Sequence, residues 1–171
     1  MYTINSNIIY GSNGVCTITD IRKENFFGEE KDYYILKPTY TEGSIFYVPI
    51  DSELLTGRMR HILTLDEIYG LIQVMPDERT AWIQDNRLRN ERYKEILAKS
   101  DSKELVQLIK TIYTRKQEQL AIRKKLGAVD ESSLAKALKI LYNEFSLVIS
   151  IEPEDVVPFI FQQIQRDETD I

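Results

Sequence analysis

The sequence predicts an α+β protein, in which a small five-stranded antiparallel β-domain of the Tudor/SH3-like type precedes an all-α domain of about five helices. Alternating apolar residues and frequent turn signals fill the first 62 residues, and from Thr64 the apolar spacing becomes helical. The chain is 43% hydrophobic and 29% charged, as is ordinary for a globular protein. We place the two domains at residues 1–62 and 63–171.

Short alternating runs separated by Gly, Asn and Pro predict the β-domain. The runs lie at residues 8–10, 15–27, 32–37, 44–50 and 58–62. In the longest run, Val15, Thr17 and Ile21 are expected on one face, with Cys16 and Ile18 on the other. Five short strands rich in Tyr and β-branched residues indicate a small barrel or curled sheet, a fold that binds partners far more often than it catalyses.

Helical spacing governs the remainder of the chain. Thr64 and Glu67 fit a capping box that opens a helix ending before Pro76. Asp130 is expected to cap a later helix, and Pro158 requires the last helix either to begin after Pro153 or to bend. We therefore expect helices at residues 64–75, 79–99, 102–113, 130–149 and 153–164, with residues 116–127 forming a frayed end and a loop.

Charge is distributed unevenly along the chain. The net charge is −5, yet residues 76–126 carry 13 Lys and Arg against 8 Asp and Glu, while the flanking segments are acidic. A local excess of cations is typical of contact with nucleic acid phosphates, although half of these residues could simply line solvated helix faces. The basic segment comprises Arg79, Arg87, Arg89, Arg92, Lys94, Lys99, Lys103 and Lys110.

The single Trp of the chain, Trp82, lies inside this basic segment. On an ideal helix it would lie within about 20° of Tyr93, but Asn86 and Arg89 would interrupt the apolar stripe between them. A lone Trp is more often an anchor in a core or between domains. The surrounding cations favour the other interpretation, in which the indole contacts something outside the fold.

Several classes of chemistry are disfavoured by the residues present. Cys16 and His61 are the only Cys and His, so neither an intramolecular disulfide nor a His/Cys zinc site can form. No phosphate-binding loop or nucleophile motif occurs, and we expect no cofactor, no metal and no enzymatic activity. No membrane span or secretory signal is evident, which predicts a cytoplasmic protein with no membrane partner and no small-molecule substrate.

The order of several motifs resembles the bacterial CarD/CdnL transcription regulators, whose N-terminal module is shared with the transcription-repair coupling factor. The resemblance covers nearly the whole chain, and its combined pattern is more specific than any single motif. It is carried by residues 9–14, 28–36 and 46–50, by Trp82, by Arg92-Tyr93-Lys94, by Leu97 and Ser100-Asp101, by the helix of residues 105–113, and by residues 141–145.

The resemblance implies a helical domain that touches promoter DNA just upstream of the melted bubble. Trp82 would wedge into the minor groove and slow bubble collapse, which stabilises the open complex. Arg92 and Lys94 occupy the positions of the family's phosphate contacts. Arg87 and Arg89 are nearby cations in a segment that is longer than in many members.

The same resemblance implies that the β-domain docks on the β subunit of RNA polymerase. Glu24, Phe26 and Tyr47 would face the polymerase, on strands that could extend a partner's sheet. Glu24 and Tyr47 replace the Arg found in some members, so aromatic packing rather than charge would dominate the contact. The protein would then be bacterial and associated with the nucleoid through the polymerase.

Two other functions remain open from the residues. The first is a Tudor-like adaptor that binds RNA or the ribosome, with the helical domain as a protein dock. The second is a nuclease that uses carboxylates and a metal, although the acidic pairs Glu29-Glu30 and Glu154-Asp155 lie at a turn and at a helix start, where solubility or the helix dipole explains them.

Overall fold

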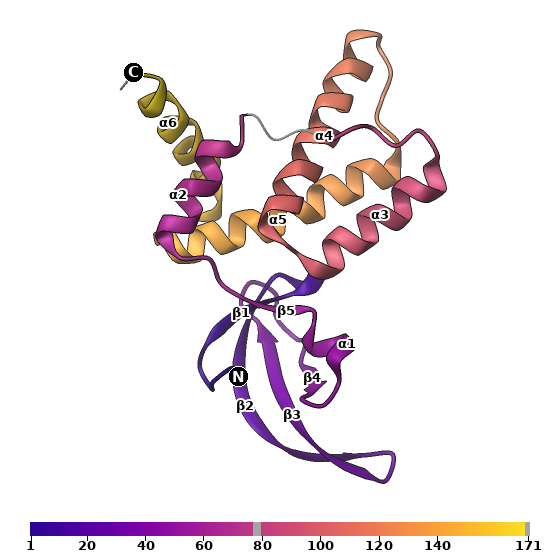
Figure 1. The fold of residues 1–171 in the computed structure, drawn as a ribbon, viewed down its shortest axis with the longest axis vertical. Helices are drawn as coiled ribbons and strands as arrows, with labels where there is room; N and C mark the ends of the chain where they lie inside the picture. Colours follow the sequence, from indigo (N-terminus) through magenta and orange to yellow (C-terminus); the bar gives the residue numbers. More distant parts are fainter. Residues whose placement is uncertain (77–79, 170–171) are drawn as a thin grey trace.

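The computed structural model describes residues 1–76 and 80–169. It confirms the α+β class, with a curled antiparallel sheet at one end of the molecule and the helices at the other (Figure 1). A long hairpin extends from the sheet, away from the helices (Figure 1). The two parts therefore present separate surfaces.

The sheet has the strand order β4-β3-β2-β1-β5. Its first four strands form a meander and the fifth returns to pair with the first, as expected for a Tudor/SH3-like fold. A short helix, α1 (Glu53–Thr56), connects the last two strands and was not expected from the sequence. The strands are β1 (Asn7–Tyr10), β2 (Val15–Phe26), β3 (Glu29–Pro38), β4 (Phe46–Pro49) and β5 (Met59–His61), and a 3₁₀ turn, η1 (Gly11–Asn13), follows β1.

A β-bulge at Thr19 corrects the expected alternation along β2. Ile18 lies opposite Leu36 and Ile21 lies opposite Tyr34, so Thr19 is the extra residue. Ile21 consequently joins the face of Ile18 and packs against the sheet's core. Its expected place beside Val15 is wrong because a bulge shifts the two-residue period by one position.

In the described part of the chain, five α-helices follow the sheet, as expected. The capping box is confirmed, because the Thr64 side chain accepts from the Glu67 amide and the Glu67 carboxylate accepts from the Thr64 amide. A 3₁₀ turn, η2 (Pro153–Asp155), precedes the last helix, so Pro158 falls in that helix's first turn, where its missing N–H costs no bond. The helices are α2 (Leu65–Val74), α3 (Asn86–Lys99), α4 (Ser102–Ala121), α5 (Ala128–Ile149) and α6 (Val156–Thr169).

Three helix boundaries differ from the expectation. Helix α3 begins at Asn86 instead of residue 79, because Asp85 caps it by accepting from the Leu88 amide. Helix α4 continues to Ala121 through the polar stretch that was expected to be a loop, since Glu, Gln, Lys and Arg are good helix formers. Helix α5 begins after Gly127, so Asp130 lies inside its first turn and does not cap it.

The hydrophobic core joins the two domains. Neighbouring strand residues point to opposite faces, so Ile8 and Cys16 fill the sheet's own core while Ile9 and Val15 enter the core formed by α3, α4 and α5. A third cluster, around Phe145, packs α2, α5 and α6 together. The β-domain and the helical domain thus share one of their cores.

A buried ion pair fixes the seam between the domains. Arg60 on β5 makes two parallel hydrogen bonds of 2.7 Å to the carboxylate of Glu144 on α5, and Glu144 is fully buried. The Leu63 amide donates to the same carboxylate at 2.9 Å. The bidentate geometry holds β5 in one orientation against α5.

A second polar contact closes the seam at η1. The Ser100 hydroxyl donates to the Gly11 carbonyl at 2.7 Å. Gly11 has a φ of +46°, and a Cβ there would lie 2.9 Å from the Ala98 carbonyl oxygen. Only glycine allows η1 to approach the end of α3 this closely.

Candidate functional site

The residues predicted to face the polymerase lie on the distal half of the β2–β3 hairpin and on the neighbouring strand β4. Glu24 and Phe26 are two residues apart on β2 and therefore share a face. Tyr47 on β4 lies opposite Ile35, which lies opposite Asp20 on that same face of β2. The structure thus brings the three residues onto one face of the sheet.

The aromatic residues of this face pack on one another and remain accessible. The rings of Phe26 and Tyr47 meet edge to face, with centroids 5.3 Å apart, and each residue is 39% exposed. Tyr33 lies buried beside Phe26, at 5.2 Å between ring centroids. Glu24 accepts a 2.6 Å hydrogen bond from Arg22, which pairs its charge. Phe26 and Tyr47 are therefore not residues of the sheet's core. We call the surface formed by Arg22, Glu24, Phe26, Tyr33 and Tyr47 the aromatic face.

The tip of the hairpin adds a residue that the sequence did not single out. Phe27 and Gly28 form a two-residue turn with φ values of +57° and +85°, and Phe27 is fully exposed. A bulky residue at positive φ is strained, by roughly 1–3 kcal/mol. This turn places the exposed phenyl ring of Phe27 at the tip of the hairpin.

The hairpin also offers a free backbone edge. Strand β1 pairs with β2 only up to Thr17, so within the described residues no strand pairs with the outer side of β2 from Ile21 to Phe26. Unpaired N–H and C=O groups on such an edge can accept a strand from a partner protein.

Trp82 lies in a segment without regular secondary structure, residues 80–85, and not on a helix. The shared helical face with Tyr93 is therefore wrong, because α3 begins only at Asn86. The indole is half-buried, with the guanidinium carbon of Arg89 at 4.4 Å and that of Arg115 at 5.4 Å from the ring centroid. Two cations thus lie against the ring, at distances typical of cation–π contacts.

The guanidinium group of Arg89 is bound by hydrogen bonds within the protein. It donates to both carboxylate oxygens of Asp130, at 2.8 and 3.2 Å, and to the Ile83 carbonyl at 2.9 Å. Asp130 is buried and also accepts from the Tyr93 hydroxyl at 2.8 Å. Hydrogen bonding to Asp130 raises the pKa of Arg89, and burial raises the pKa of Tyr93. With only 11% of its side chain exposed, Arg89 supports Trp82 and has little capacity left for a phosphate.

The other predicted cations divide between two sides of α3. Arg87 and Lys94 are exposed, lie about 20° apart around the helix, and make no ion pair within the described residues. Arg92 is on the opposite side, about 160° from Lys94, where it bonds Glu104 at 2.8 Å and Glu95 at 3.2 Å. These carboxylates, Glu104 first, raise the pKa of Arg92.

Besides Arg89, Arg92 is the predicted cation that lines the cleft beside the indole. Trp82, Arg89 and Arg92 line one cleft of about 100 Å³ between residues 80–83 and helices α3 and α4. Arg79, which belongs to the predicted basic segment, lies outside the described residues. The structure thus places Trp82 and Arg92 in one cleft. Arg87 and Lys94 lie on another side of α3, where their side chains are exposed.

Two residues of this site were missed from the sequence. Arg115 reaches Trp82 from α4 with 32% of its side chain exposed, and residues 116–127 were expected to be irregular just beyond it. Asp130 was expected only to cap a helix. The spacing of 41 residues between Asp130 and Arg89 gives no local signal for their pairing.

No described residues form a metal or nucleophilic centre. Within the described part of the chain, no group of three or more His, Cys, Asp or Glu residues could hold a metal ion. Burial raises the pKa of the Cys16 thiol to about 12, which keeps it protonated and unreactive. Among the helices in the described ranges, none is long and apolar enough to cross a membrane.

The five-stranded antiparallel sheet followed by helices defines the class of α+β proteins with a Tudor-like β-domain. Residues 2–63 match the family model described as the CarD-like/TRCF RID domain, which confirms the resemblance read from the motifs over this part of the chain. The whole chain is similar to YdeB of Bacillus subtilis (strain 168), named as a candidate transcription factor, with 23% identity over 163 residues, 93% of this chain and 99% of YdeB. These findings support a transcription-related role and point away from an enzyme.

Proposed function

We propose that this protein regulates transcription initiation by binding the RNA polymerase β subunit through its aromatic face and promoter DNA through Trp82. Contact at the upstream edge of the bubble would stabilise the open complex. The observation that carries the proposal is the support of Trp82: the ring is half-buried against two guanidinium groups and belongs to none of the described hydrophobic clusters.

The chemistry around Trp82 suits a partly melted duplex. An indole can enter a base step that is already unstacked, and this step costs least at the edge of a bubble. Arg115 and Arg92 are exposed enough to contact phosphates beside the ring, and Arg87 and Lys94 can hold a more distant part of the backbone.

The overall charge of −5 makes strong DNA binding by the free protein unfavourable. Binding to polymerase would place the protein beside the promoter and supply the high effective concentration that the DNA contact needs. We therefore expect weak, salt-sensitive DNA binding by the protein alone and a much larger effect in the presence of polymerase.

The hairpin is suited to a protein partner. Phe26 and Tyr47 form an exposed aromatic patch, Phe27 projects beyond it, and the outer edge of β2 is available for strand pairing. The family description names an RID, which denotes an RNA polymerase-interacting domain. The exposed rings would supply most of this contact, since the charge of Glu24 is already paired with Arg22.

Replacing the indole tests the DNA contact. Trp82→Ala should shorten the lifetime of open complexes formed with purified polymerase, measured after addition of a competitor, while co-purification with polymerase is unchanged. Because Trp82 lies outside the hydrophobic clusters, the helical domain should remain folded by circular dichroism. Trp82→Phe should retain part of the effect as a matched aromatic control. An unchanged lifetime, or a cooperative loss of helix, would contradict the proposal.

Replacing an exposed ring tests the polymerase contact. Tyr47→Arg should abolish co-purification with polymerase without lowering the melting temperature appreciably, because the side chain is not part of the core. Phe161→Arg, at an exposed Phe on α6, serves as the control and should bind normally. Recovery of ribosomal proteins without polymerase subunits would instead favour an RNA- or ribosome-binding adaptor.

A further inference from the structure

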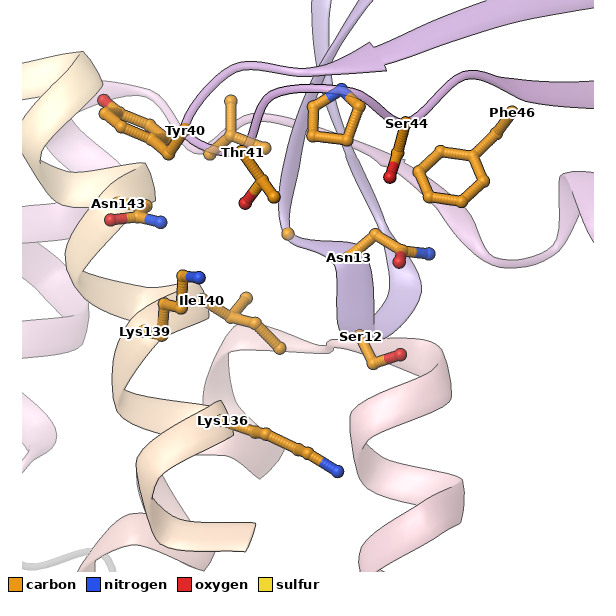
Figure 2. A pocket seen from close by; sticks show the side chains of 13 residues that line it. Ser12, Asn13, Tyr40, Thr41, Ser44, Phe46, Lys136, Lys139, Ile140 and Asn143 are labelled. Carbon is orange, nitrogen blue, oxygen red and sulfur yellow. The ribbon is translucent and has the colours of Figure 1, made fainter. Parts of the chain in front are cut away.

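A polar cleft lies at the seam between the domains, apart from the aromatic face and from Trp82. It has a volume of about 290 Å³ and is bounded by η1, by the loop between β3 and β4, and by helix α5 (Figure 2). Thirteen residues line it, and none of them is acidic. In a chain with 27 Asp and Glu, a wall of this size without a carboxylate is a chemical feature that needs an explanation.

Two lysines give the cleft a positive charge. Lys136 and Lys139 are three residues apart on α5, so both project from the same side of the helix. Both side chains are exposed, and neither makes an ion pair with a carboxylate of the described residues. Residues 127–171 contain only three Lys or Arg against nine Asp and Glu, and two of those three cations line this cleft.

Uncharged donors complete the site from both domains. In Figure 2, the Lys139 ammonium lies near the Asn143 amide, and the Thr41 hydroxyl points toward the same space from the β3–β4 loop. Asn13 of η1 lies across Ile140 from them, and the Lys136 ammonium lies lower in the view, below Ser12 (Figure 2). An ammonium, an amide and a hydroxyl that converge without a carboxylate suit an anion that accepts several hydrogen bonds.

Aromatic rings lie at the upper edge of the same opening. Tyr40, 39% exposed, and Phe46, half-buried, come from the loop and from the start of β4 (Figure 2). A flat ring could pack against either of them while its anionic group contacts Lys139. The cleft is near the lower end of the ~300–1,000 Å³ typical of small-molecule sites, and it is walled by both domains, so a small ligand fits better than a duplex.

We propose that this cleft binds the phosphate group of a small phosphorylated molecule, with Lys139 as the principal contact, Asn143 and Thr41 as further donors, and Lys136 adding positive charge at a greater distance. Such a ligand would touch the β-domain and the helical domain at once. Its binding would stabilise their present arrangement, because a ligand that binds only the folded state raises stability.

The test uses the full-length protein without polymerase or DNA, so its outcome is independent of the proposed role in transcription. Amide resonances are followed by NMR during titration with adenosine monophosphate and, separately, with inorganic phosphate. At least one probe should shift the amides of Gly14, Thr41, Ser44 and Asn143. Tighter binding of the nucleotide would indicate that a ring adds contacts, and equal binding would indicate that phosphate alone is recognised.

Two matched variants separate a site from general charge attraction. Lys139→Gln should weaken binding about tenfold, the usual effect of one lost charge-assisted hydrogen bond, and Lys136→Gln should weaken it less. Lys125→Gln removes the same charge from an exposed loop elsewhere and should leave binding unchanged. Equal affinities in all three variants, no shift of the four amides with either probe, or shifts with duplex DNA alone would overturn the proposal.

Discussion

The ion pair between Arg60 and Glu144 makes a quantitative prediction about the domain seam. Arg60→Met keeps most of the side-chain volume but leaves a fully buried carboxylate whose remaining described donor is the Leu63 amide. Removing one member of a buried pair typically costs about 3–5 kcal/mol. Arg60 is 20% exposed, so water can partly replace it, and we expect a loss near the lower limit, about 3 kcal/mol.

Urea denaturation followed by circular dichroism measures this loss. The transition midpoint should fall while its slope stays constant, since the surface exposed on unfolding does not change. The melting temperature should fall by about 6–12 °C, because 1 kcal/mol corresponds to roughly 2–4 °C at this chain length. Arg22→Met, which breaks a pair whose Arg side chain is 51% exposed, should leave the transition midpoint nearly unchanged.

The double variant Arg60→Met/Glu144→Leu gives the decisive comparison. Removing both charges leaves the Leu63 amide without its acceptor, a cost of about 1–3 kcal/mol. The Ser100 carbonyl loses its Arg60 donor in the single and in the double variant alike. The double variant should therefore be no less stable than Arg60→Met alone, and the two substitutions should be strongly non-additive. Additive losses, or a change below 1 kcal/mol for Arg60→Met, would refute the conclusion that this pair joins the domains.

Three further predictions concern single buried groups. Asp130→Asn should lower stability by about 2 kcal/mol and change the fluorescence of Trp82, because Arg89 loses the charged partner that holds it against the indole. Cys16 should resist thiol reagents in the folded protein, because folding raises the pKa of its thiol from 9.0 to about 12. The contribution of the protonated thiol to stability is therefore complete below pH 9 and is lost as the pH rises toward 12. Denaturation at a series of pH values measures this loss. Gly11→Ala should destabilise by at least about 1 kcal/mol in thermal melts, since it combines a positive φ with a contact of 2.9 Å to a backbone oxygen of α3.

Local signals were sufficient for most of the fold. The alternation of the strands, the turn residues between them and the capping box at Thr64 act within a few residues, so the sequence displays them directly. The bulge at Thr19 left no such signal, because the alternating pattern reads the same with or without one extra residue. The predicted start of helix α3, residue 79, is earlier than the observed start at Asn86, because Asp85 could not be recognised as the cap among several polar residues.

The candidate site was predictable in composition but not in geometry. Trp82 and the cations could be chosen by residue type, whereas their mutual placement depends on contacts between distant segments. The Asp130 carboxylate that occupies Arg89 comes from α5, and the Arg115 that flanks the indole comes from α4. The common face of Phe26 and Tyr47 likewise depends on the register of β3 with β4, which no single strand encodes.

The shared core and the buried pair have a consequence for the proposed function. Two weak contacts, one to polymerase and one to DNA, reinforce each other only if the protein holds them at a nearly fixed separation. An apolar seam alone would tolerate sliding, whereas the bidentate bonds between Arg60 and Glu144 are satisfied in a single orientation. Under this proposal, Arg60→Met should shorten open-complex lifetime even at temperatures where the protein is fully folded and still co-purifies with polymerase. A normal lifetime in that folded variant would mean that the two contacts act independently of the seam.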